Sequence, residues 1–559
     1  MRIIESGSYF HIIFPYRPSL VERVKSIPGR RWDPVNKVWK VPISSRTSVE
    51  RFARANNFRM NGNSSAPVVR DFKIPELPTL QQSIPLKMDL YPFQKQGVAY
   101  SLQRKRLIIG DQMGLGKTAQ AIATITASQA FPCLVICPAS LKLNWQREWH
   151  MWTSRKALLL SNQNKNTWHM FTDPKNNLFG TGAIADVFIV NYESLKKYFV
   201  KEINTPRGRN LRITDIKFKE TIHIFKSVII DESHRAKDPK TQQAKFVKGI
   251  CMGKEYILAL TGTPVVNKPR DLVSQLAIIE QLKNFGGYQN FVNRYCEGWD
   301  GAENLEELNW LLNKNCFYRR DKGEVLKDLP AKVRQVVQCD ITTRKEYKDA
   351  LADLEIYLKK YRQATDDQVA RAMRGEVMVR IGILKNISAR GKLNDVVDYI
   401  KDVVDSDDKI VVFVHLREVA SFLKQMFPVS VTVLGEDDTR TRQINIDKFQ
   451  NDPDCQIIIC SIKAGGVGIT LTASSLVAFV ELPWHPADCD QAEDRLHRIG
   501  QANSVQCTYF LGKNTIDEWI YKLIDEKRRI SNTITGARDE VETSIQDSII
   551  NLFNKELRI

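Results

Sequence analysis

Short apolar runs alternate with helical patterns in two separate stretches of this chain. From Leu90 to about Pro264 the runs are RLIIG, CLVIC, VFIV, SVII and YILAL, and the later stretch contains KIVVFV, SVTVL, CQIIIC, LVAFVEL and VQCTYFL. Such alternation is typical of parallel strands joined by crossover helices. Residues 265–390, which separate the two stretches, are mostly helical in pattern. The sequence therefore predicts an α/β protein with two lobes and helical insertions.

The first 60 residues have a different pattern. The β-rich runs SYFHIIF and KVWKVPI flank a helical stretch, SLVERVKSI, which indicates a small α+β module. We interpret the N-terminus as a first strand rather than a signal peptide, because Glu5 interrupts it and no small-residue cleavage site follows. Residues 61–85 are rich in Pro, Ser and Asn, as linkers are. We expect a module at 1–62, a linker at 63–85, a first lobe with a helical insertion at 86–335, a helical segment at 336–390, a second lobe at 391–530 and a tail at 531–559.

Charge is concentrated at the N-terminal end. The chain has a net charge of +18, and residues 1–60 hold 12 Lys or Arg against 4 Asp or Glu, which is +8. A basic surface suits nucleic acid or an acidic membrane surface, or it serves solubility alone. A basic module at one end favours a polyanion as partner. No apolar run approaches the roughly 20 residues that cross a bilayer, so no membrane partner is expected.

The ten cysteines are scattered, and no CxxC pair occurs. Cys133 and Cys137 lie in one strand-like run, about 13 Å apart if extended, too far to share a metal ion. We interpret the cysteines as reduced, buried thiols of a cytosolic type of compartment.

A phosphate-binding loop follows the run RLIIG. The segment DQMGLGKT, residues 111–118, leads into the helical pattern AQAIATITAS, which is the strand–loop–helix context that such a loop requires. Gly114, Leu115 and Gly116 bring backbone amides to the phosphates, and the helix N-terminus adds positive partial charge. Lys117 is expected to reach the β- and γ-phosphates, and the Thr118 hydroxyl to bind Mg²⁺. Asp111 opens the loop where the general pattern has Gly.

Paired carboxylates follow another apolar run, SVII. Asp231 and Glu232 stand at its end, where parallel sheets place their ligands. Asp231 would complete the shell of the Mg²⁺ ion, and Glu232 would orient and deprotonate the attacking water. Together with Lys117 they predict an ATPase.

The arrangement resembles the Swi/Snf-type ATPases of helicase superfamily two. LYPFQ at residues 90–94 is similar to that family's adenine-sensing segment, CPASL at 137–141 to its first DNA-contacting motif, and LTGTP at 260–264 to the motif that couples hydrolysis to movement. SIKAGGVGIT at 461–470 is similar to the family's fifth motif. The resemblance implies two RecA-like lobes, a nucleotide contact by Gln94 and Gly468, and DNA contacts by Ser140, Lys142, Thr263, Lys463 and Thr470.

The run QAEDRLHRIGQ, residues 491–501, is similar to the sixth motif of the same family. Arg495 and Arg498 are three residues apart, so on a helix they would share one face. Placed across the cleft, they would neutralise charge on the transferring γ-phosphoryl group as arginine fingers do. Because they come from the other lobe, hydrolysis would depend on lobe closure.

Within the family, the run ELPWHP before this motif resembles the HepA-related annealing helicases. Residues 9–42 resemble the small HARP domain that accompanies such motors. This resemblance implies a sensor of DNA structure, with Arg30 and Arg31 on phosphates and Trp32 or Trp39 stacked on unpaired bases. The alternative, that both tryptophans belong to the core of the module, stays open.

These observations together predict an ATP- and Mg²⁺-dependent translocase on duplex DNA that remodels branched DNA by annealing strands or regressing forks. The alternatives are a remodeller of chromatin or protein–DNA complexes, which lacks support from any histone-reading segment here, and a DNA-binding scaffold with a vestigial ATPase. Double-stranded and branched DNA are the expected partners, with single-strand-binding or replication and repair proteins possible. We expect a monomer, cytoplasmic in a bacterial or phage-infected cell and nuclear in a eukaryote.

Overall fold

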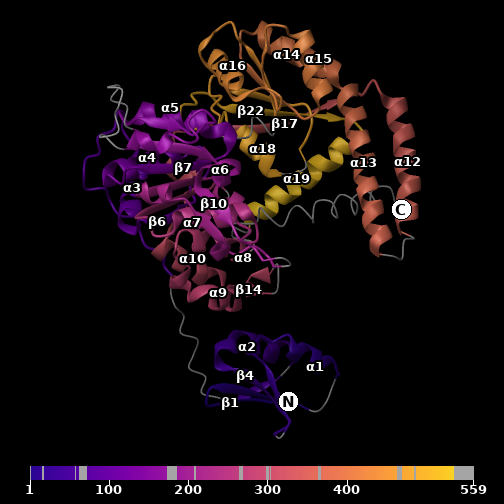
Figure 1. Ribbon diagram of the computed structural model, residues 1–559. Coiled ribbons are helices and arrows are strands. Elements are labelled where there is room, and N and C mark those ends of the chain that lie inside the picture. The colour runs from indigo at the N-terminus through magenta and orange to yellow at the C-terminus, as the bar shows by residue number, and fades with distance from the viewer. Residues whose placement is uncertain are drawn as a thin grey trace. The chain divides into compact units, whose positions relative to one another are not determined.

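The computed structural model describes residues 2–14, 18–34, 36–56, 58–61, 72–172, 185–206, 209–262, 269–297, 301–302, 304–362, 367–462, 469–483 and 486–533 (Figure 1). The chain divides into two compact units. Met1–Ile74 with Phe285–Leu311 forms one, and Pro75–Asn284 with Leu312–Ile559 forms the other.

The N-terminal part of the first unit is a five-stranded sheet with the order β3-β4-β2-β1-β5. Its strands are β1 (Arg2–Ser6), β2 (Tyr9–Ile13), β3 (Arg31–Asp33), β4 (Val38–Pro42) and β5 (Arg59–Asn61). Helices α1 (Pro18–Lys25) and α2 (Arg46–Ala55) contribute apolar residues to one core with the sheet, which includes Phe10, Ile12, Val24, Val41 and Phe52. The alternation of apolar residues along β2 decides which face of the sheet is buried.

The rest of the first unit is helical. It contains α9 (Gly287–Tyr295), the two-stranded ribbon of β14 (Cys296–Glu297) and β15 (Gly301–Ala302), and the larger part of α10 (Leu305–Asn315). Arg294 on α9 donates to the Glu307 carboxylate on α10, with 2.8 Å from Nε to Oε1.

The first lobe of the second unit contains a seven-stranded parallel sheet with the order β16-β6-β13-β12-β7-β9-β8. The strands are β6 (Arg106–Ile109), β7 (Cys133–Cys137), β8 (Ala157–Leu159), β9 (Val187–Asn191), β12 (Ser227–Asp231), β13 (Tyr256–Leu260) and β16 (Phe317–Tyr318). Helices α3 (Pro92–Arg104), α4 (Lys117–Ser128), α5 (Lys142–Trp152), α6 (Leu195–Phe199), α7 (Gln242–Cys251) and α8 (Pro269–Ile278) belong to this lobe. The residues of β7 and β13 are buried throughout, which explains their continuous apolar runs.

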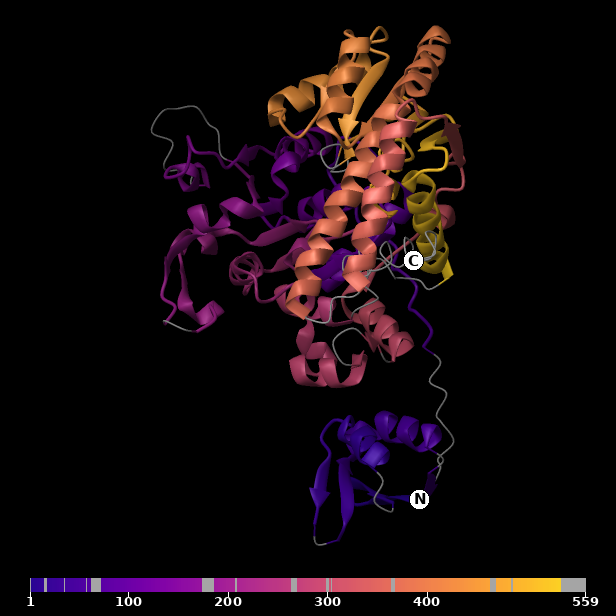
Figure 2. The ribbon, with the colours of Figure 1, turned by 90° about the vertical axis from the view of Figure 1, so that its right-hand side faces the viewer.

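The second lobe contains a six-stranded parallel sheet with the order β17-β22-β21-β18-β20-β19. Its strands are β17 (Lys332–Cys339), β18 (Ile410–Val414), β19 (Val431–Val433), β20 (Ile457–Ser461), β21 (Leu476–Phe479) and β22 (Val505–Gly512). Its helices are α14 (Leu393–Asp405), α15 (Arg417–Met426), α16 (Thr439–Asn451), α18 (Pro486–Glu493) and α19 (Ile516–Thr533). The two long helices α12 (Arg344–Arg362) and α13 (Asp367–Gly391) lie side by side in both views (Figures 1 and 2).

The predicted fold class, two α/β lobes with helical insertions, is confirmed. One strand lies where the sequence did not lead us to expect it. β17 begins at Lys332, ahead of the long helices, yet it pairs along its whole length with β22 in the second lobe's sheet. Its exposed residues mix Val333 and Val336 with Arg334, Gln335 and Gln338, as an edge strand allows, so no continuous apolar run marks the strand in the sequence.

Candidate nucleotide-binding and catalytic site

The phosphate loop lies between the end of β6 and the start of α4. Gly114 and Gly116 have φ values of +85° and +73°, in the left-handed region that glycine adopts without strain. A Cβ atom on Gly116 would lie 2.4 Å from Nε2 of Gln94, so alanine there would have to displace the Gln94 amide. The backbone therefore turns tightly against α3 before it enters α4.

Gln94 supports the loop from behind. Its side chain is buried, Oε1 accepts a hydrogen bond from the Tyr91 amide at 3.0 Å, and Nε2 donates to the Leu115 carbonyl at 3.2 Å. The residue that we expected to read the base therefore lies against the phosphate loop and fixes its shape.

Asp111 is buried, and its carboxylate is hydrogen-bonded to Arg320 and Gln120. Oδ1 accepts hydrogen bonds from the backbone N–H and from Nε of Arg320, both at 3.0 Å, and Oδ2 accepts one from Nε2 of Gln120 at 2.9 Å. What Asp111 offers to the loop is its carbonyl oxygen, which accepts a hydrogen bond from Nζ of Lys117 at 2.7 Å. The sequence did not single out Arg320, whose partner lies 209 positions earlier in the chain.

Lys117 is the first residue of α4, and Thr118 is the second. Burial lowers the pKa of the Lys117 ammonium, while the carboxylates of Glu232, Asp111 and Asp231 act in the opposite direction. The half-buried Thr118 side chain lies in the same first turn, where the backbone N–H groups of a helix are unpaired.

Asp231 and Glu232 end β12 on the same sheet. Oδ2 of Asp231 accepts a hydrogen bond from Nε1 of Trp145 at 2.8 Å, and Oδ1 accepts one from the Glu232 amide at 2.9 Å. Burial, followed by the charge of Glu232, raises the pKa of Asp231 to about 7. The Trp145 indole therefore holds this carboxylate in place.

Glu232 leaves the strand with a φ of +50°, which turns its side chain toward the cavity described below. Nδ1 of His234 lies 3.4 Å from its Oε2. A positive φ at a residue other than glycine is uncommon and occurs often at active sites. Tyr192 secures the turn, because its hydroxyl donates to the Asp231 carbonyl at 2.7 Å.

The second lobe brings Arg495 and Arg498 to this site. The prediction that they share one face of a helix was wrong, because α18 ends at Glu493 and both arginines follow in a turn. Burial, followed by the charge of Arg498, lowers the pKa of Arg495 to about 10, while Glu232 and Asp231 oppose that shift. Arg495 thus lies within electrostatic range of the carboxylates of the first lobe.

Arg498 lies directly against the phosphate loop. A Cβ atom on Gly114 would come within 3.0 Å of Cβ of Arg498, and Nη1 of Arg498 donates to the Ile469 carbonyl at 3.2 Å. Burial lowers its pKa, and the carboxylates of Glu148 and Asp494 oppose this. The structure therefore brings Lys117, Asp231, Glu232, Arg495 and Arg498 together at one site.

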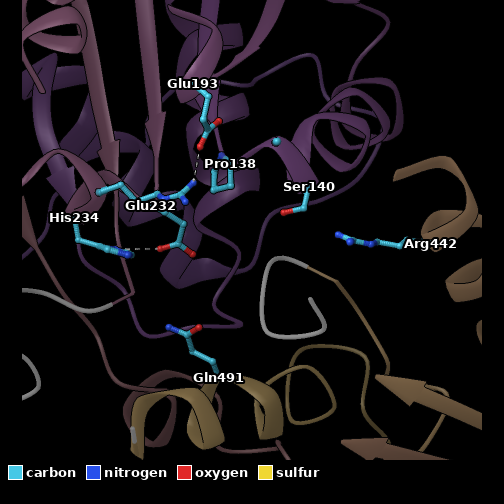
Figure 3. A pocket seen from close by; sticks show the side chains of 9 residues that line it. Pro138, Ser140, Glu193, Glu232, His234, Arg442 and Gln491 are labelled. Atoms are coloured by element: carbon cyan, nitrogen blue, oxygen red, sulfur yellow. Dashed lines mark ion pairs between the residues drawn. The ribbon is translucent and has the colours of Figure 1, made fainter. Parts of the chain in front are cut away.

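A cavity of about 360 Å³ lies beside Glu232 and is lined by both lobes. The first lobe contributes Ser140, Glu193, Glu232 and His234 among others, and the second lobe contributes Arg442 and Gln491. In Figure 3, the His234 ring faces the Glu232 carboxylate, and Arg442 points toward Ser140.

The other residues of the lobes that we expected to contact DNA differ in their burial and in their contacts. Ser140 lines the cavity, and Thr470 is half-buried. Nζ of Lys142 donates to the Leu160 carbonyl at 2.5 Å, so its ammonium group is held inside the lobe. Thr263, Lys463 and Gly468 lie outside the described residues.

In the N-terminal module, Arg30 and Arg31 are exposed. Trp39 packs partly against the core of the module, whereas Trp32 is 45% exposed. The two tryptophan rings lie 5.2 Å apart between centroids, so they form one aromatic surface at the edge of the sheet. Of the two rings, Trp32 is the one left exposed to solvent.

Neither a membrane-crossing helix nor a side-chain metal cluster is found in the described parts of the chain. None of the helices there is both long and apolar enough to span a bilayer. The same residues contain no group of three or more His, Cys, Asp or Glu side chains that could hold a metal ion.

Comparison with known proteins identifies relatives along most of the chain. Residues 93–390 match the SNF2-related domain, and residues 391–500 match the helicase conserved C-terminal domain. The chain is 29% identical, over 94% of its length, to the Xenopus tropicalis SWI/SNF-related matrix-associated actin-dependent regulator of chromatin subfamily A-like protein 1. It is 31% identical, over 83% of its length, to the human DNA annealing helicase and endonuclease ZRANB3.

The chain spans 55% of the frog relative and 42% of the human one. Among solved structures, the Sulfolobus solfataricus SWI2/SNF2 ATPase core in complex with dsDNA is 25% identical, over 86% of this chain and 98% of that chain. Its TM-score of 0.36 is too low to compare the arrangement of the parts.

Proposed function

The chain belongs to the SNF2-related family, and on that premise we propose that it is an ATP-driven translocase that moves on duplex DNA and remodels branched DNA. The observation that carries the proposal is the approach of Arg498, from the second lobe, to Gly114 of the phosphate loop in the first lobe. A catalytic site built from both lobes makes hydrolysis depend on their closure, and such dependence converts a nucleotide cycle into movement.

The loop is suited to a nucleotide triphosphate. Its two left-handed glycines leave no side chain between the backbone amides and a bound phosphate, and Lys117 already reaches into the loop. Thr118 and Asp231 would hold the Mg²⁺ ion, with an oxygen ligand each. When bound, ATP supplies the phosphoanhydride bond whose hydrolysis provides the energy.

The protein's own residues then have separate tasks. Lys117, Arg495 and Arg498 would neutralise the charge that develops on the phosphate oxygens. Glu232 would orient the attacking water and accept its proton, while the hydrogen bond from Trp145 holds Asp231 in place beside it. Arg495 is buried and the other four charged residues are partly buried, which limits their contact with bulk water and strengthens these electrostatic interactions.

Branched DNA is proposed as the substrate on two grounds. The human relative is named a DNA annealing helicase, and the N-terminal module combines a net charge of +8 over residues 1–60 with the exposed Trp32. Basic groups bind phosphates, and an exposed ring can stack on an unpaired base. Duplex and forked DNA are therefore the proposed partners. The protein would act in the cellular compartment that contains this DNA.

ATP hydrolysis in the presence of single-stranded, duplex and forked DNA tests this function. We expect duplex and forked DNA to stimulate hydrolysis, and Lys117→Ala to abolish it while DNA binding persists, because Lys117 contacts phosphates and the proposed DNA contacts lie elsewhere. A folded Lys117→Ala protein with unchanged hydrolysis would disprove the phosphate-loop assignment.

A further inference from the structure

Lys322 connects the phosphate loop of the first lobe to the sixth motif of the second. It is the first residue of the short helix α11 (Lys322–Val325), which follows the edge strand β16. Its side chain is 7% exposed, so this ammonium group is held among protein atoms.

The backbone around Lys322 is attached to the phosphate loop at three points. The Lys322 amide donates to Oε1 of Gln112 at 2.7 Å, and the Gln112 amide donates to the Arg320 carbonyl at 3.0 Å. The Arg320 amide donates to Oδ1 of Asp111 at 3.0 Å. The start of α11 is therefore fixed to the loop rather than to the second lobe.

The side chain of Lys322 crosses to the other lobe. Its Nζ lies 2.9 Å from Oδ1 of Asp494 and donates to the His497 carbonyl at 2.6 Å. Asp494 directly precedes Arg495 in the sequence, and His497 directly precedes Arg498. The Lys322 ammonium group is therefore bonded to the residue that precedes each arginine. A Cβ atom on Gly114 would meet Cε of Lys322 at 3.1 Å and Cβ of Arg498 at 3.0 Å, so both side chains cover the same glycine.

Two further positively charged side chains contact the sixth motif, but they belong to the second lobe itself. Lys332 lies 2.9 Å from Glu493 and 3.3 Å from Asp494, and Arg334 lies 2.6 Å from the Glu493 carboxylate. Both belong to β17, which is part of the second lobe's own sheet. They support the motif from within its lobe, whereas Lys322 reaches it from the loop that would hold the phosphates.

We propose that Lys322 is a positioning residue for ATP hydrolysis, which sets Arg495 and Arg498 in register with the phosphate loop when the lobes close. This inference rests on the proposed function. Lys322 acts through Asp494 and the His497 carbonyl, and its substitution should therefore impair turnover more than nucleotide binding. A misplacement of about 1 Å at a distance from the reacting atoms can cost about 100-fold in rate.

The test compares Lys322→Met with wild type, and with Lys327→Met as a matched control on an exposed lysine of the same segment. We expect Lys322→Met to lower kcat on duplex DNA by roughly 10- to 100-fold, with the KM for ATP changed less than about threefold. Lys327→Met should retain wild-type kinetics. An unchanged kcat in Lys322→Met, or a loss confined to KM, overturns the proposal.

A double-mutant cycle with Asp494→Asn separates positioning from general damage, and the double variant leaves neither buried charge facing a missing partner. Both changes break the Lys322–Asp494 pair, although Lys322→Met also removes the bond to the His497 carbonyl and Asp494→Asn also removes a 3.3 Å ion pair with Lys332. We therefore expect the double variant to lose clearly less kcat than the product of the two single losses. Losses that multiply would show that the two residues act independently and would contradict the inference.

A binding measurement distinguishes failure of this inference from failure of the proposed function. ADP with aluminium fluoride mimics the γ-phosphoryl group in transfer, and wild type should bind it more tightly than ADP alone. Lys322→Met should lose most of that preference at similar ADP affinity. If wild type hydrolyses no ATP on any DNA, the proposed function fails and the role of Lys322 in hydrolysis fails with it. If wild type hydrolyses ATP on DNA and Lys322→Met keeps the preference, only the role of Lys322 is overturned.

Discussion

Burial moves the pKa of three ionisable groups in the catalytic cleft toward the neutral form. It lowers the pKa of Lys117 and of Arg495, and it raises the pKa of Asp231 to about 7. Charged groups held away from water are costly unless opposite charges face them. A bound polyanionic nucleotide with its divalent ion would supply those charges, so the cleft is prepared for a ligand of this kind.

Arg498→Ala tests the contribution of the second lobe to catalysis. Because Arg498 lies against Gly114, its loss should lower turnover by roughly 10³-fold, which is the scale of an arginine finger. ATP binding should change much less. Steady-state hydrolysis and nucleotide affinity, measured together, check this, and a collapse of affinity with normal turnover per bound ATP would refute the finger role.

The rate should also depend on pH through Lys322. Burial lowers its pKa to about 8, Asp494 opposes that shift, and the nearby charges of Lys332 and Arg498 add to it. The ammonium form is present below this pKa and is lost as the pH rises through it, so kcat should fall above about pH 8. Lys322→Met removes the titrating group, and its lower kcat should lack this alkaline decline. The same decline in both proteins would assign it to another group.

Single residues were predictable where the chemistry forces a local pattern. Lys117, Asp231 and Glu232 follow apolar strands, and the sequence placed them together on that basis. Lys322 and Arg320 carry no such pattern, since their partners Asp494 and Asp111 lie 172 and 209 positions away. Only the folded chain brings them together. The turn that holds Arg495 and Arg498 was missed because spacing alone does not reveal where a helix ends.

At the scale of elements, α3 and α4 cross closely at Gly97. A Cβ atom there would lie 2.1 Å from Oε1 of Gln120 and 2.6 Å from the Tyr318 hydroxyl. Gln120 also donates to Asp111, so this contact extends to the start of the phosphate loop. The parallel sheets were predictable from their apolar strands, but close helix contacts of this kind depend on small residues without any periodic signal.

Gly97→Ala should therefore destabilise the first lobe, by about 1–3 kcal/mol, as overpacking of a core does. Gly382→Ala is the matched control, because Gly382 is exposed on α13 and no heavy atom of the described residues lies within 4 Å of its Cβ position. Alanine favours a helix over glycine by up to about 1 kcal/mol, so the control should be neutral or stabilising. Denaturant unfolding measures both, and equal effects would contradict the packing account.

At the scale of the whole molecule, the N-terminal module has a core of its own and brings much of the positive charge. We propose that it recognises DNA structure while the two lobes supply the motor. The sequence predicted the α+β character of the module, while the polar linker that it also predicted at 63–85 lies partly outside the described residues. It did not predict that residues 285–311 fall within the same compact unit.

Deletion of residues 1–62 should separate these two roles. Hydrolysis on saturating duplex DNA should survive, while affinity for forked DNA drops. The slope of log affinity against log salt should also flatten, by about one unit for each lost phosphate contact. Salt titrations of binding to forked and blunt DNA check this. Identical slopes and an unchanged fork preference in a stable truncated protein would refute the recognition role.

The most direct test of the account is the conversion of a labelled model fork into its regressed, reannealed product. We expect wild type to form this product only with ATP and Mg²⁺, and Lys117→Ala and Arg498→Ala to form little or none while they still bind the fork. Product formation by Lys117→Ala at the wild-type rate, or separation of the strands without reannealing, would contradict an ATP-driven translocase that remodels branched DNA.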